Sequence, residues 1–295
     1  MPSDIHRLFS RTLWLLFLFI IALLYALGGG IARYLGATID AGLYWLGQLW
    51  VFTLFMATFL LDRYYDPQSN VENLGRQLLG ILPHRSALMF GAALSLTITA
   101  SLTVLLIRRD ILTPPILTIL ITSVVGAFLY AIPPIRLANA GFGELTLSIL
   151  IANLVPAFAF LLQLGEFHRL IAMATFPLTF LLLATILALR FPNYASHLKY
   201  RKNSLMIRMG WDSAMTAHNI FVLAAFVIIG LAALFGFPSF AATPLLLALP
   251  LALVQIWYIT RIAGGIKPNW NVLSLSAVIL IAFTSYLLAL AFWTN

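Results

Sequence analysis

The chain has 295 residues, of which 62% are hydrophobic and only 9% are charged. Its mean hydropathy of +1.01 excludes a soluble globular protein and predicts one that lies in a lipid bilayer. The net charge is +8, but no soluble basic domain is present, so nucleic acid is not an expected partner. The absence of cysteine excludes disulfides and thiolate sites for metals or catalysis.

Nine segments are apolar over about 20 residues, the length that a helix needs to cross a bilayer. In chain order they cover residues 12–32, 41–61, 86–107, 112–132, 143–163, 170–190, 215–236, 239–260 and 271–293. Strands are not expected, because backbone exposed to lipid must satisfy its own hydrogen bonds. We therefore predict one all-α integral membrane domain over residues 1–295, with nine transmembrane helices in a bundle around a central cavity. Its two halves, about 12–132 and 143–293, are predicted to be related.

The basic residues predict the orientation of this bundle. With the N-terminus in the cytoplasm, 13 of the 17 lysines and arginines fall on the inside: Arg7, Arg11, Arg63, Arg76, Arg85, Arg136, Arg190, Lys199, Arg201, Lys202, Arg208, Arg261 and Lys267. An excess of positive charge on the inside is the usual bias of membrane proteins. We expect a protein of the prokaryotic plasma membrane whose basic cytoplasmic face meets anionic lipid headgroups or an anionic substrate. The first apolar run has no convincing cleavage site, so we expect it to remain as a membrane anchor.

Two acids stand where the second span ends. Asp62 and Asp66 are one helical turn apart, and Asn70 would continue the same side of a longer helix. Carboxylate and amide oxygens suit Mg²⁺, which usually takes one or two carboxylates together with phosphate oxygens of a substrate. Pro67 predicts that the helix kinks or ends before Asn70.

A second polar connection follows the sixth span. Asn193 and His197 repeat the one-turn spacing, but neither side chain brings the negative charge that Mg²⁺ prefers. Lys202 and Arg208 follow, and such cations can clamp a diphosphate.

Both clusters also have a plainer interpretation. The two acids could pair with Arg63 and Arg76 at the level of the lipid headgroups, and His197 could serve as a hydrogen-bonding partner. Lys199 and Arg201 could be ordinary inside charges.

Prolines and glycines mark the remaining connections. Two prolines end the fourth span just before Arg136, which lies at the membrane interface. Glu144 opens the fifth span, where a helix N-terminus favours an acid, so a structural cap competes with a catalytic role. The glycines at 28–30 lie near the outer face and are expected to pack helices rather than bind phosphate.

With these segments in order, the chain resembles the UbiA superfamily of membrane prenyltransferases over nearly its whole length. The resemblance rests on nine spans, an N-x-x-x-D-x-x-x-D motif after the second, and a tyrosine–proline–arginine stretch after the fourth, here YAIPPIRLANAGFGEL. The segment FPNYASHLKYRKNSLMIRMG after the sixth span is similar to the family's F-P-D-x-x-x-D-x-x-x-G-K-x-T-L-x-V-R-L-G. These stretches resemble the menaquinone, chlorophyll and archaeal-lipid branches.

The resemblance implies transfer of a prenyl group from a prenyl diphosphate to an aromatic or other lipophilic acceptor. It places Asp62 and Asp66 on metal-binding positions of the first motif. It places basic residues on positions expected to contact the diphosphate: Arg76, Lys202, Arg208 and Arg136.

The chain also departs from the family pattern. Asn70, Asn193 and His197 stand where the family has aspartates. One Mg²⁺ on Asp62, Asp66 and Asn70 is therefore the expected cofactor. The alternative is a catalytically inactive member that binds a prenyl lipid or quinone, or serves as a membrane assembly partner.

Overall fold

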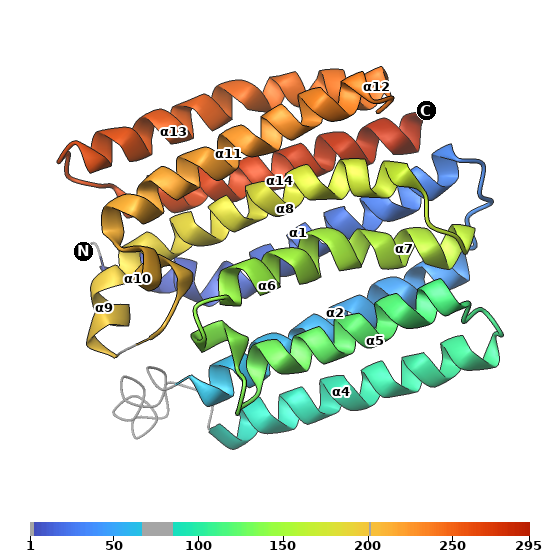
Figure 1. Cartoon of the computed structure of the whole chain (residues 1–295). Helices are drawn as coiled ribbons and strands as arrows, with labels where there is room; N and C mark the ends of the chain where they lie inside the picture. Colours follow the sequence, from blue (N-terminus) through green and yellow to red (C-terminus); the bar gives the residue numbers. More distant parts are fainter. Residues whose placement is uncertain (1–2, 67–84, 201) are drawn as a thin grey trace.

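A computed structural model describes residues 3–66, 85–200 and 202–295, and these fold into a bundle of long helices that lie side by side (Figure 1). Within these ranges nine helical segments are long and apolar enough to cross a membrane. They cover Leu15–Tyr34, Ala41–Tyr65, Arg85–Arg108, Pro114–Ala131, Gly143–Leu164, Arg169–Lys199, Trp211–Leu234, Ser239–Ala263 and Trp270–Thr294. The nine predicted spans are confirmed, with ends that differ by a few residues in most cases.

The helices have the following bounds: α1 (Ser3–Tyr34), α2 (Ala41–Tyr65), α4 (Arg85–Arg108), α5 (Pro114–Ala131), α6 (Gly143–Ile149), α7 (Val155–Leu164), α8 (Arg169–Arg190), α9 (Tyr194–Lys199), α10 (Leu205–Met209), α11 (Trp211–Leu234), α12 (Ser239–Ala242), α13 (Leu249–Ala263) and α14 (Trp270–Thr294). A π-helical turn, Leu150–Leu154, joins α6 to α7 within one span. No strand forms in the described ranges apart from one isolated bridge between Ala140 and Asn203.

Burial sorts these helices into a centre and a periphery. The most apolar part of α8 is 78% buried, whereas the corresponding parts of α4 and α11 are only 28% buried. Helix α1 packs against α7 and α14, α8 against α11 and α14, and α2 against α4, α5 and α7. The apolar outer faces of α4, α11 and α13 are therefore left for lipid.

Glycine lets the central helices approach closely. A Cβ atom on Gly28 of α1 would overlap the carbonyl oxygen of Pro156 in α7. A Cβ atom on Gly30 would lie 2.9 Å from the Trp293 ring of α14. These contacts agree with the prediction that this glycine run packs helices.

We call the end of the bundle where α2, α5 and α8 finish, at the left of Figure 1, the polar end. Helix α2 ends at Tyr65, and Asp66 has extended backbone (φ −69°, ψ 116°), as expected for a residue that precedes proline. Asp62 and Asp66 therefore do not share the face of one continued helix. The central cavity and the relationship between the two halves remain predictions.

Candidate functional site

The acid beyond the end of α2 is bound by a lysine from the segment between α9 and α10. Lys202 Nζ lies 2.7 Å from Asp66 Oδ2, and the two side chains are only 14% and 24% exposed. The main chain of Lys202 is held as well, because its N–H donates to the His197 carbonyl at 2.9 Å. This ion pair joins the two connections in which the sequence predicted a site.

The other acid pairs with an arginine from the connection after α5. Arg136 Nη2 lies 3.5 Å from Asp62 Oδ1 and donates to the main-chain carbonyl of Asp62 at 3.2 Å. The Arg136 side chain is 12% exposed, and its backbone is in the left-handed region, with φ 37°. One guanidinium therefore binds both the carboxylate and the helix end, where unpaired carbonyl groups need donors.

A third ion pair links α6 to α8. Glu144, in the first turn of α6, is fully buried. Its Oε1 lies 3.3 Å from Arg190 Nε at the end of α8, and its Oε2 accepts from the Leu205 N–H at 3.1 Å. The same carboxylate thus anchors α8 and the start of α10. A helix cap alone does not account for Glu144, because its side chain also contacts residues that are distant in the sequence.

The second predicted motif is split by the structure. His197 is buried in α9 and interacts electrostatically with Arg190, Lys202 and Asp66, so it joins the site. Its buried Nδ1 has no hydrogen-bond partner. Asn193 is exposed and precedes the first residue of α9. Of the two positions, only His197 is therefore buried in the polar end.

The remaining predicted residues are more peripheral. Arg208 is exposed, donates from Nε to Asn203 Oδ1 at 3.3 Å, and lies over the Phe142 ring at 4.9 Å. Gly141 makes room for it, since a Cβ atom there would overlap the Arg208 side chain. Asn70 and Arg76 fall outside the described residues.

The polar end offers few side chains that could bind a metal ion. In the described part of the chain, no group of three or more histidines, aspartates or glutamates could hold an ion. Asp62 and Asp66 do provide two partly exposed carboxylates, with side chains 35% and 24% exposed. Two carboxylates fit Mg²⁺ when phosphate oxygens complete its coordination. The residues therefore fit a metal that arrives with a phosphorylated ligand better than a resident structural ion.

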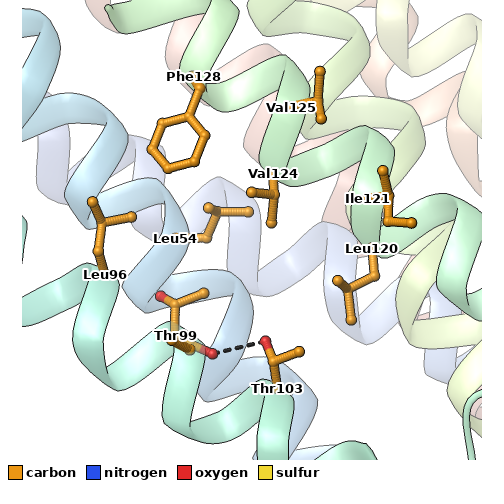
Figure 2. Close-up of a pocket in the computed structure, with 10 residues that line it drawn as sticks. Leu54, Leu96, Thr99, Thr103, Leu120, Ile121, Val124, Val125 and Phe128 are labelled. Atoms are coloured by element: carbon orange, nitrogen blue, oxygen red, sulfur yellow. Dashed lines mark hydrogen bonds between the residues drawn. The ribbon is translucent and has the colours of Figure 1, made fainter.

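A separate, apolar groove lies between α4 and α5, with α2 as its floor, and has a volume of about 480 Å³. Figure 2 shows Leu54, Thr99 and Phe128 among the side chains around it. The Thr103 hydroxyl donates to the Thr99 carbonyl and accepts from Trp50 Nε1, so its polar atom is already paired. No lining residue is charged, and the groove offers mostly hydrocarbon contacts.

Sequence reasoning missed the pair of Glu144 and Arg190. Both residues were interpreted locally, one as a cap and the other as an inside charge. A signal was present, because the start of the fifth span and the end of the sixth lie at the same end of the bundle. An acid among apolar helices there needs a cation from a neighbouring helix.

Comparison of the sequence with models of protein families and with curated proteins finds no match. Among solved structures, the chain is similar to a UbiA homolog from Archaeoglobus fulgidus bound to GPP and Mg²⁺. The TM-score is 0.54 at 13% sequence identity, over 96% of this chain and 99% of that chain. At this low identity the similarity shows a shared arrangement of helices. The protein therefore has the fold of a UbiA homolog, as its motifs predicted.

Proposed function

We propose that the protein transfers a prenyl group from a prenyl diphosphate to an aromatic or other lipophilic acceptor, as a UbiA-type prenyltransferase. One observation carries the proposal: Asp62 and Asp66 meet Arg136 and Lys202 from two other connections at one end of an apolar bundle. Carboxylates for a divalent ion beside cations for phosphate are the groups that departure of a diphosphate needs. The similar Archaeoglobus structure, which carries GPP and Mg²⁺, supports the same ligand class.

In this proposal each group has a defined task. Asp62 and Asp66 hold one Mg²⁺, joined by Asn70 of the first motif. Arg136, Lys202 and Arg208 bind the diphosphate, as does Arg76. When bound, Mg²⁺ neutralises charge on the diphosphate oxygens as the bond to the prenyl carbon breaks. The apolar bundle keeps water away from the allylic carbon.

The test is binding of geranyl thiolodiphosphate, whose leaving group departs slowly, to the purified full-length chain. Binding should require Mg²⁺, and Asp66→Asn should weaken it at least about tenfold, because the metal loses one of two carboxylates. Asp40→Asn is the matched control: it removes the same charge at the other end of α2, where Asn can still accept the cap bond from Leu43 N–H. Binding without any need for Mg²⁺ would exclude this function.

The alternative is a non-catalytic protein that binds a prenyl lipid or quinone, or acts as a membrane assembly partner. It is favoured by the second motif, where Asn193 is exposed and His197 is a neutral replacement for a carboxylate. The two functions differ in turnover. The alternative predicts a neutral lipid that copurifies with the protein, and no pyrophosphate released from any allylic diphosphate.

We further propose that the polar end faces the cytoplasm of a prokaryotic cell. Support comes from the basic residues gathered in its connections, among them Arg85, Arg136 and Lys267. The chain has no cysteine, so a single introduced cysteine is the only site for a thiol label. Lys267→Cys places this site at the polar end, and Asp110→Cys places it at the opposite end. A membrane-impermeant maleimide added to intact cells should label the second variant and not the first.

A further inference from the structure

The carboxylates proposed to bind the metal form ion pairs with the cations proposed to bind the diphosphate. Lys202 Nζ lies 2.7 Å from Asp66 Oδ2, and Arg136 Nη2 lies 3.5 Å from Asp62 Oδ1. All four side chains are at most 35% exposed, so water screens these pairs only partly. A metal ion that approaches either carboxylate therefore meets a cation already in place.

This arrangement sets up a competition that only the two ligands together can resolve. A divalent ion alone must displace the ammonium of Lys202 from Asp66, or bind beside it against like-charge repulsion. A diphosphate alone must draw the same ammonium away and leave Asp66 with less compensation. When both are present, the ammonium passes to a phosphate oxygen and the metal takes its place on the carboxylate.

We infer that Lys202, with Arg136 beside it, is an exchangeable counterion that couples metal binding to diphosphate binding at this site. The inference rests on the proposed function and adds to it a mechanism that lowers the affinity of the site for either ligand alone. By linkage, each ligand must raise the affinity for the other by the same factor, of order 5- to 150-fold for typical couplings.

The backbone around Lys202 suits this exchange. Its N–H is held by the His197 carbonyl, and the next residue, Asn203, forms the bridge to Ala140. The main chain is therefore fixed on both sides of a four-carbon stem that can swing its ammonium between acceptors. Arg136 has less freedom, since its guanidinium also binds the main-chain carbonyl of Asp62. Lys202 is thus the counterion that moves further.

The experiment measures Mn²⁺ binding to the full-length protein by the loss of the free-ion electron paramagnetic resonance signal. Lys202→Met removes the ammonium from Asp66 and should bind Mn²⁺ alone about tenfold more tightly than the wild type, since a charged hydrogen bond no longer competes with the metal. Lys199→Met is the matched control: it removes the same charge from an exposed lysine that lies over the Tyr200 ring. It should bind Mn²⁺ as the wild type does.

Two further variants guard against a folding defect. Lys202→Arg keeps a cation at this position and should show wild-type affinity for Mn²⁺. Asp66→Asn combined with Lys202→Met should lose the gain in affinity, because the carboxylate that binds the metal is gone. The same samples are titrated with inorganic pyrophosphate and with geranyl thiolodiphosphate, and a titration without protein corrects for complexes that Mn²⁺ forms with each anion in solution. Lys202→Met should bind both anions more weakly and show a smaller coupling to Mn²⁺.

The outcomes separate the two proposals. If Lys202→Met and Lys199→Met bind Mn²⁺ equally well, the counterion role is wrong, even where the wild type binds the thiolodiphosphate. If Lys202→Met gains Mn²⁺ affinity but no variant binds either anion, the proposed function and the exchange built on it are both overturned.

Discussion

Arg136 binds Asp62 twice, from Nη2 to the main-chain carbonyl at 3.2 Å and to Oδ1 at 3.5 Å, while its own backbone is left-handed at φ 37°. Residues other than glycine are strained in this region, by about 1–2 kcal/mol. A residue that keeps this conformation with a long charged side chain is held there by its contacts. Strain of this kind is concentrated at functional sites.

Two substitutions of Arg136 distinguish the effect of its left-handed backbone from the effect of its guanidinium. Arg136→Gly and Arg136→Gln should both weaken Mg²⁺-dependent binding of geranyl thiolodiphosphate, by about tenfold, because both lack the cation. Arg136→Gly should nevertheless be more stable than Arg136→Gln by about 1 kcal/mol, since glycine adopts positive φ without strain. Thermal unfolding followed by tryptophan fluorescence compares the two proteins. Equal stability would show that the left-handed backbone is not strained, and retained binding would remove Arg136 from the site.

The buried pair of Glu144 and Arg190 predicts a large loss of stability on removal of one partner. Arg190→Leu leaves a fully buried carboxylate without its cation, and should lower the free energy of unfolding by about 3 kcal/mol. Adding Glu144→Gln should recover much of this loss, because the amide oxygen can still accept from the Leu205 N–H. Unfolding in mixed detergent and SDS micelles measures both.

An exposed pair at the opposite end serves as the control. Arg109 and Asp40 are 48% and 60% exposed and 4.0 Å apart. Arg109→Leu should change stability by less than about 1 kcal/mol. A loss as large as that of Arg190→Leu would mean that charge in general, rather than burial, determines the effect.

The spans could be predicted because hydropathy is a local property of the sequence. The predicted segment 143–163 corresponds to the observed Gly143–Leu164, and the predicted start at residue 41 is the start of α2. The end of α2 could also be predicted from neighbouring residues, since Pro67 disfavours helical backbone at Asp66. Both depend on residues within one or two turns of the position concerned.

Partners in the site could not be assigned in this way. Lys202 and Asp66 are 136 residues apart in the chain, and the sequence placed both at one face of the membrane without pairing them. The plainer interpretation paired the two acids with Arg63 and Arg76, which lie near them in the sequence. Among the described residues, Asp62 pairs with Arg136 and Asp66 pairs with Lys202. Ion pairs at equal membrane depth have many possible combinations, and only helix packing selects among them.

A buried polar pair joins α11 to α13. His218 is fully buried, and its Nε2 lies 3.1 Å from Gln255 Nε2, while its Nδ1 lies 3.2 Å from Asn219 Oδ1. His218→Leu and Gln255→Leu should each destabilise the protein by about 1–3 kcal/mol, because the remaining partner is left unpaired in an apolar interior. The double variant should lose less than the sum of the two. Simple additivity in this double-mutant cycle would show that the two side chains do not stabilise each other.

The close contact of α1 with α7 predicts that alanine at Gly28 destabilises the protein, and the same substitution at Gly230 serves as the control. Gly28→Ala places a methyl group against the Pro156 carbonyl, a backbone atom that cannot turn away. The helices must separate, and we expect a loss of about 1–3 kcal/mol, as for other overpacked cores. Gly230→Ala in α11 adds the same methyl group where no atom lies within 4 Å. It should leave stability unchanged or raise it by up to about 1 kcal/mol, because alanine favours helix more than glycine. Unfolding in SDS micelles measures both variants, and equal behaviour would show that close approach at Gly28 does not position α1 against α7.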